Sequence, residues 1–161
     1  MNIKFKLSII LLLIIVLISI FAPIFSNYNP LEIQKGKQFL PPSMIHYFGT
    51  DEFGRDVFSR TLYAGRISLL AGLVAVIVSA LVGVPLGLIS GYYGKIIDTC
   101  IMRTMDSLLA FPALLLALSI VAVLGPSSIN AMIAVSIVSI PNFARISRAS
   151  ILTQKEKDYV E

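Results

Sequence analysis

Four long apolar runs alternate with polar segments along the chain. Residues 7–25, 67–91 and 127–144 carry no charged side chain, and residues 96–124 carry charges only in their first part. A helix rises about 1.5 Å per residue, so runs of about 18 residues suffice to cross a hydrocarbon core of about 30 Å. The pattern predicts an all-α fold, a polytopic transmembrane bundle of about four helices.

The second run has a row of small residues along one helical face. They recur at every fourth position, as Ser79, Gly83, Gly87 and Gly91, and we call this row the glycine lane. Because the hydrophobic effect does not drive helices together in lipid, close backbone approach along such a row supplies the packing. We expect another helix against the lane, with general helix packing as the alternative to a specific role. Pro85 lies within it and is expected to bend or loosen the helix.

The first run has two interpretations. Lys4 and Lys6 precede an apolar stretch, as in a secretory signal peptide. The run is longer than a signal core, however, and Ala22 is followed by Pro23 without an A-x-A pattern. These details favour a retained transmembrane helix over residues 1–26.

Residues 27–66 form the one long polar segment. Asn-Pro at 29–30 and Pro-Pro at 41–42 favour turns and extended backbone. From Asp56 onward the apolar side chains fall on one helical face, which predicts an amphipathic lead-in to residues 67–161. Asp56 and Arg60, spaced i,i+4, are expected to pair weakly. A solvated surface helix is the alternative.

The third and fourth runs contain further breaks. Residues 96–124 would extend roughly 43 Å as a helix, so their charged beginning should project beyond the hydrocarbon. Arg103 and Asp106 are close enough in sequence to pair and are expected to anchor the helix at the interface. Phe111-Pro112 predicts a kink in the third run, and Pro141 interrupts the end of the fourth.

Composition narrows the classes of function. Of 161 residues, 57% are hydrophobic and 14% charged, with a net charge of +4. The basic residues flank apolar runs, which favours membrane orientation over nucleic-acid binding. With one cysteine, Cys100, and one histidine, His46, the chain has no disulfide framework, and we expect neither a metal site nor a cofactor.

Charge also predicts orientation in the cell membrane. Four crossings put both ends in one compartment, and the basic residues near both ends favour the cytoplasm. We therefore expect a cytoplasmic N-terminus and an extracytoplasmic segment at residues 27–66. The basic residues of that segment count against this orientation: Lys35, Lys37, Arg55, Arg60 and Arg66.

Residues 49–60 read GTDEFGRDVFSR and are followed by GRISL at 65–69. This resembles the GTDxxGRDxxSR pattern of permeases in dipeptide, oligopeptide and nickel ABC importers, specifically the second of the two permeases. The matching positions are Gly49, Thr50, Asp51, Gly54, Arg55, Asp56, Ser59, Arg60 and Arg66. GVPLG with GYYG, MR with FP, and Pro141 to Arg148 agree in order as well, so the resemblance covers nearly the whole chain.

The resemblance implies both a mechanism and partners. The last residues look like the opening of the EAA loop, a cytoplasmic helix that docks on an ATPase: Lys155, Glu156, Lys157, Asp158, Tyr159, Val160 and Glu161. The implied partners are a second permease subunit, two ATP-binding subunits, an extracytoplasmic substrate-binding protein and membrane lipid, with no nucleic acid. The chain would be an N-terminal fragment that holds a partial permease core in residues 67–161.

Transport would then follow alternating access by a bistable bundle. The sequence has no GxxxxGK[ST] pattern, so ATP hydrolysis is expected on a separate subunit and this chain is expected to be non-catalytic. An intramembrane enzyme is disfavoured because the runs contain neither HExxH nor GxSxG. A truncated inactive permease and a small self-contained adaptor or channel stay as alternatives, and the transported substance is left open.

Overall fold

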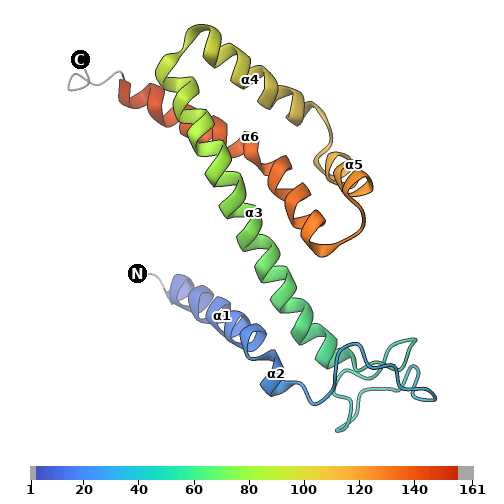
Figure 1. The fold of residues 1–161 in the computed structure, drawn as a ribbon. Coiled ribbons are helices and arrows are strands. Elements are labelled where there is room, and N and C mark those ends of the chain that lie inside the picture. Colours follow the sequence, from blue (N-terminus) through green and yellow to red (C-terminus); the bar gives the residue numbers. More distant parts are fainter. Residues whose placement is uncertain (1–2, 156–161) are drawn as a thin grey trace. The chain divides into compact units, whose positions relative to one another are not determined.

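The computed structural model describes residues 3–155 (Figure 1). Its helices are α1 (Ile3–Ile20), α2 (Ala22–Phe25), α3 (Val57–Tyr93), α4 (Lys95–Ala110), α5 (Ala113–Leu124) and α6 (Ser128–Lys155). Extended pairing within the described residues is limited to an isolated bridge between Thr50 and Asp56. The predicted all-α fold is confirmed.

Three helices are long and apolar enough to cross a membrane, namely α1, α3 and α6. Helices α4 and α5 together meet the same criteria of length and composition, although they are bent by 92° at the break between them. Three spans, or four if the bent pair counts as one, agree with the prediction of about four.

Large apolar side chains face outward, and small or polar side chains face inward. Leu73, Leu81 and Leu118 are each more than half exposed, whereas Ser79 and Ser136 are fully buried. A water-soluble core has the opposite arrangement. Helices surrounded by lipid pack through small residues and interhelical hydrogen bonds, which is the arrangement seen here.

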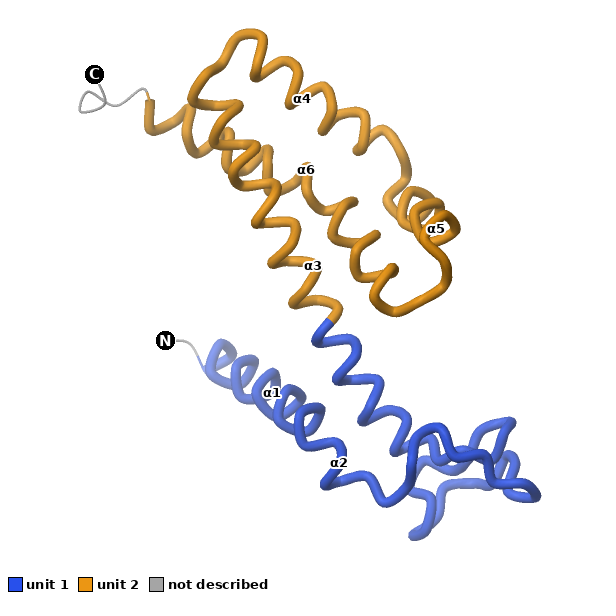
Figure 2. Tube along the Cα trace, viewed as in Figure 1, with its two compact units in different colours: residues 1–70 blue, residues 71–161 orange. Residues whose placement is uncertain are grey.

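The chain divides into two compact units, Met1–Leu70 and Ala71–Glu161, and α3 contributes residues to both (Figure 2). Unit 1 holds both of the predicted segments 1–26 and 27–66. In this unit Gly65 of α3 lies directly against Ser19 of α1. The rings of Tyr47 and Phe48 pack edge-on against Phe58, each with centroids 5.2 Å apart. The polar segment is therefore attached to the beginning of α3.

Prolines break the helices at two places, of which the sequence predicted one, at Pro112. Pro23 lies in the first turn of α2, and the first run is two helices instead of one. Phe111, which precedes Pro112, is extended at φ −86° and ψ 139°, because a residue before proline avoids the helical region. In contrast, α3 continues through Pro85 and α6 continues through Pro141.

One predicted helix end differs as a result. The fourth helix does not end near residue 144 but reaches Lys155. The amphipathic lead-in is continuous with the apolar run that follows it, because α3 runs unbroken for 37 residues. At 1.5 Å per residue its length is about 56 Å, well beyond a hydrocarbon core of about 30 Å.

Candidate functional site

The motif residues gather around two carboxylates of the polar segment. The Asp51 side chain accepts hydrogen bonds from the backbone N–H groups of Phe53 (2.9 Å) and Arg55 (3.0 Å). It also accepts from Arg55 Nε (2.8 Å) and from Arg60 Nη1 (2.7 Å). One carboxylate thus closes the turn at residues 51–55 and binds it to the first turns of α3.

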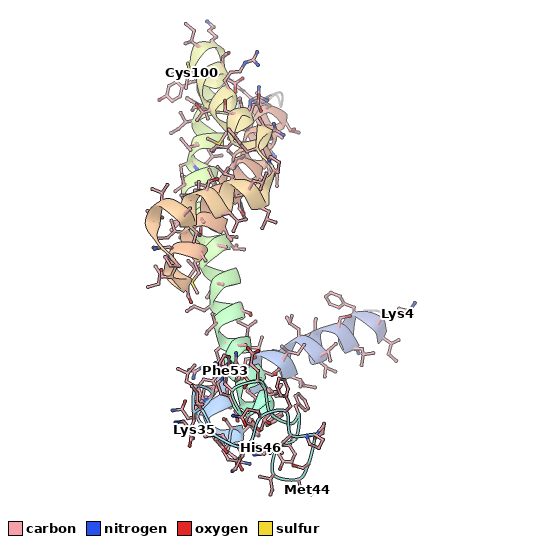
Figure 3. The ribbon with its side chains drawn as sticks, turned by 90° about the vertical axis from the view of Figure 1, so that its right-hand side faces the viewer. Lys4, Lys35, Met44, His46, Phe53 and Cys100 are labelled. Atoms are coloured by element: carbon pink, nitrogen blue, oxygen red, sulfur yellow. The ribbon has the colours of Figure 1, made fainter. Side chains whose placement is uncertain are left out.

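The second carboxylate, Asp56, caps α3. Its Oδ2 accepts from the Ser59 backbone N–H (2.7 Å), as the first turn of a helix requires. Its Oδ1 lies 2.9 Å from Nδ1 of His46. His46 and Asp56 are only 3% and 2% exposed, so the pair is removed from solvent. Figure 3 labels His46 together with Met44, which is 89% exposed two residues away.

The predicted pairing of Asp56 with Arg60 is wrong. Arg60 instead binds Asp51, and Asp56 binds His46 and the Ser59 backbone. The i,i+4 rule failed here because an N-capping carboxylate turns back toward the first-turn N–H groups. The sequence gives little sign of this role of His46, beyond the fact that the single histidine lies ten residues before Asp56.

Hydrogen bonding changes the acidity of both carboxyls. Burial raises the pKa of Asp56, but hydrogen bonds from Ser59 and His46 outweigh it and the net pKa is lowered. For Asp51 burial likewise raises the pKa, and hydrogen bonds from Arg55 and Phe53 bring the net value below that of a free carboxyl. Both groups are therefore stabilised as carboxylates.

Two motif glycines permit the turns to close. Gly49 and Gly54 have φ values of +72° and +75°, a region that side chains rarely adopt. A Cβ at Gly54 would overlap the carbonyl oxygen of Gln34, and one at Gly49 would overlap that of Leu40. Both positions therefore require glycine for conformation and for space.

The remaining motif residues have separate positions. Thr50 Oγ1 donates to the Lys37 carbonyl (2.5 Å) and accepts from the Leu40 N–H (2.8 Å). Ser59 is fully buried in the first turns of α3. The Arg66 guanidinium lies 6.0 Å from the centre of the Tyr63 ring.

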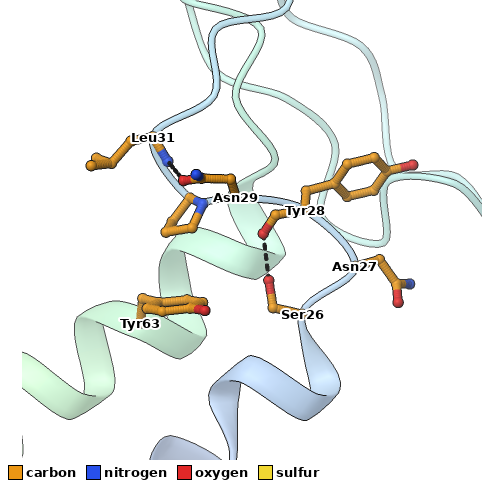
Figure 4. Close-up of a pocket in the computed structure, with 7 residues that line it drawn as sticks. Ser26, Asn27, Tyr28, Asn29, Leu31 and Tyr63 are labelled. Carbon is orange, nitrogen blue, oxygen red and sulfur yellow. Dashed lines mark hydrogen bonds between the residues drawn. The ribbon is translucent and has the colours of Figure 1, made fainter.

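Tyr63 also lines an open pocket of about 560 Å³ in unit 1 (Figure 4). The other lining residues follow α2 and include Ser26, whose hydroxyl donates to the Tyr28 carbonyl over 2.6 Å. Asn29 Oδ1 accepts from the Leu31 N–H over 3.0 Å. The lining residues that follow α2 therefore form a turn, and these two hydrogen bonds satisfy part of its polar groups.

In unit 2 the glycine lane lies against α6. Ser79 Oγ donates to the Ser136 carbonyl over 2.8 Å. A Cβ built at Gly83 would come within 2.7 Å of the Ile140 carbonyl oxygen, and one at Gly87 would overlap that of Ala144. The two helix backbones are thus in direct contact along the lane.

Within the described residues of unit 2, the ion pairs join different helices. The predicted Arg103–Asp106 pair is wrong, because Asp106 binds Arg145 of α6 over 2.6 Å. Asp98 binds Arg148, also of α6, over 2.5 Å. Spacing within one helix could not reveal these partners, which are 39 and 50 residues away.

The predicted ATPase-docking residues are described only at their beginning. Lys155 ends α6, and its Nζ donates to the Tyr92 carbonyl over 2.8 Å. The others lie outside the described residues: Glu156, Lys157, Asp158, Tyr159, Val160 and Glu161. Among residues 3–155, no group of three or more His, Cys, Asp and Glu side chains is placed to hold a metal ion.

Comparison with known proteins places this arrangement in a class. The profile described as "Binding-protein-dependent transport system inner membrane component" matches residues 83–161. The profile described as "N-terminal TM domain of oligopeptide transport permease C" matches residues 5–42. The chain therefore belongs to the permease family of binding-protein-dependent ABC importers and is similar to their C-type permeases.

Several curated relatives are similar over most of this chain. A dipeptide transport system permease protein of Alkalihalophilus pseudofirmus is 46% identical over 160 residues, which cover 98% of this chain and 53% of the relative. Its counterpart in Haemophilus influenzae is 43% identical over 159 residues, covering 95% and 54%. A glutathione transport system permease protein of Pectobacterium atrosepticum is 48% identical over 120 residues, covering 74% and 40%.

The chain spans about half the length of the curated dipeptide permeases that it matches. Family membership and the apolar helices together make it a multi-pass protein of the inner membrane.

Proposed function

We propose that this chain forms part of the membrane path of an ATP-driven importer for short peptides. The observation that carries the proposal is the 46% identity to a dipeptide permease along 98% of the chain. The relatives described above are named for dipeptides and glutathione, which share a peptide backbone. Peptides are accordingly a better supported substrate class than nickel chelates.

In this function the chain is a non-catalytic transport subunit. A second permease completes the path, two ATP-binding subunits hydrolyse ATP, and an extracytoplasmic binding protein delivers the substrate. Residues 155–161 begin the segment that docks on the ATPase. The close contact of α3 with α6 supports this role, because tightly packed helices move between discrete arrangements instead of deforming gradually.

We further propose that the N-terminus is cytoplasmic and that the segment 27–66 is extracytoplasmic. The support is the distribution of Lys and Arg at the ends of the apolar helices. The motif turn around Asp51 and Asp56 then stands on the side where the binding protein delivers its ligand. Its dense hydrogen bonding makes it a rigid surface for that encounter.

Reconstitution tests the function directly. The product of the complete reading frame is placed in liposomes with its second permease, ATPases and binding protein, and uptake of a radiolabelled dipeptide is followed with and without ATP. We expect ATP-dependent accumulation that glutathione or unlabelled dipeptide reduces by competition. Accumulation of a nickel chelate without any peptide uptake would overturn the substrate class, and a complex without ATP-dependent uptake would support an inactive permease.

A further inference from the structure

Three helices of unit 2 share one carboxylate. Asp98 lies in the first turn of α4, and its Oδ1 accepts a hydrogen bond of 2.5 Å from Ser90 Oγ of α3. Arg148 of α6 donates to both carboxylate oxygens, from Nε over 2.5 Å and from Nη2 over 2.6 Å. We call Ser90, Asp98 and Arg148 the carboxylate clamp.

The clamp fixes orientation as well as distance. A guanidinium that donates to both oxygens of a carboxylate holds the two groups in one plane, which a lysine ammonium cannot do. Ser90 is fully buried, and the Arg148 and Asp98 side chains are 34% and 20% exposed. The clamp therefore holds the end of α6 in a defined orientation to the beginning of α4.

A second ion pair also joins α6 to α4, but it lacks the two-oxygen contact and is more exposed. Arg145 donates through Nη2 alone to one oxygen of Asp106, over 2.6 Å. The two side chains are 52% and 47% exposed, and exposed single contacts of this kind contribute little. Arg145 thus provides a matched comparison, since it lies three residues from Arg148 on the same helix.

Beside the clamp, α6 packs closely against the backbone of α3 at Gly91. A Cβ at Gly91 would come within 3.1 Å of the Arg148 carbonyl oxygen and within 2.8 Å of Ile151 Cγ2. Four residues later on α6, after Ile151, Lys155 binds the Tyr92 carbonyl. Contact at this distance leaves no free space between Gly91 and α6, so displacement of one helix moves the other.

We propose that the carboxylate clamp couples the end of α6 to α3 and α4 during transport. The inference rests on the proposed function, in which the segment that begins at Lys155 docks on an ATPase. Movement of that segment displaces α6, and the clamp makes α3 and α4 follow. Asp98 and Arg148 are positioning residues for this movement and do not touch the transported peptide.

The test measures coupling, not assembly alone. In the reconstituted transporter, the number of dipeptides accumulated per ATP hydrolysed is compared for the wild type, Arg148→Lys and Arg145→Lys. Arg148→Lys keeps the charge but removes the two-oxygen contact, and we expect the ratio to fall roughly threefold to tenfold. Arg145→Lys should leave the ratio unchanged. Co-purification of all subunits checks that each variant assembles.

A charge exchange separates coupling from folding. The double variant Asp98→Arg with Arg148→Asp should recover part of the ratio that either single variant loses. Arg148→Lys with a wild-type ratio, or with equal loss of transport and of subunit assembly, would overturn the clamp while leaving the peptide importer intact. A wild-type complex that hydrolyses ATP without accumulating peptide would overturn the proposed function itself.

Discussion

Asp51 and Asp56 organise the polar segment at the residue scale, each by accepting several hydrogen bonds from backbone and side chains. Asp51 closes a turn that also binds Arg55 and Arg60. Asp56 both caps α3 and meets buried His46. A buried carboxylate is tolerable only because its oxygens are satisfied in this way, so loss of one partner leaves an expensive unpaired group.

Part of the pH dependence of stability follows from Asp56. Its pKa in the folded chain lies below the value of 3.8 for a free carboxyl, so the ionised group stabilises the fold above that pH. The contribution is lost as pH falls through the folded-state pKa. Asp56→Asn keeps an oxygen for the Ser59 N–H but loses the charge, and should cost about 1 to 3 kcal/mol near neutral pH. Thermal unfolding in detergent between neutral and acidic pH measures this.

The same measurement needs a carboxyl without such partners as a control. Glu52 is exposed, and Glu52→Gln should leave the midpoint of unfolding as in the wild type. If Asp56→Asn retained the full acid dependence of the wild type, the assignment to Asp56 would be incorrect.

Glycine positions in the turn offer a second prediction. Gly54→Ala combines a left-handed φ with overlap of the Gln34 carbonyl, and should cost about 2 to 4 kcal/mol. Gly36→Ala has a similar φ of +81° but no atom within 4 Å of the new Cβ, so the cost should be about 1 kcal/mol. Equal melting temperatures of the two variants in detergent would contradict the close approach at Gly54.

At the scale of elements, the closest helix contact described above in unit 2 is that of α3 with α6 along the glycine lane. Gly87→Ala places a methyl group against the Ala144 carbonyl and should destabilise the packing of α3 on α6 by about 1 to 3 kcal/mol. Gly72 of the same helix has open space around it, and Gly72→Ala should leave the stability equal or raise it by up to about 1 kcal/mol. Thermal unfolding of the two variants in the same detergent would distinguish the effect of local packing on stability from the effect of helix propensity.

The sequence predicted the spans better than their ends. Uncharged length fixes which segments can lie in lipid, and this placed α1, α3 and α6. It did not distinguish prolines that break a helix, such as Pro112, from Pro85, which the helix passes through. The difference depends on tertiary contacts that re-satisfy the freed carbonyl or shield the break, and local sequence does not contain them.

The same limit holds for the site residues: their positions could be predicted, but not their partners. The motif residues could be located from the pattern, and the left-handed turns at Gly49 and Gly54 are consistent with glycine there. Their partners could not be found, because Asp98–Arg148 and Asp106–Arg145 join helices far apart in sequence. Helical spacing rules describe neighbours on one helix and give no account of contacts between helices.

At the scale of the whole molecule, orientation is the first matter to test. Cys100 is exposed and is replaced by serine to give a background without thiols. In intact cells, Gln38→Cys should react with a membrane-impermeant maleimide, and Thr153→Cys should react only after permeabilisation, because the basic ends stay in the cytoplasm. Labelling of Thr153→Cys in intact cells, with Gln38→Cys protected, would reverse the proposed topology.

The 92° elbow between α4 and α5 sets a condition on what surrounds it. The first N–H groups of a helix have no intrahelical acceptor, and Pro112 gives α5 no side-chain cap. Hydrocarbon tails cannot accept hydrogen bonds, and each bare donor in oil costs several kcal/mol. At membrane depth the elbow must therefore be hydrated or covered by another polypeptide. A bundle exposed to lipid on every side would not keep the bend between α4 and α5.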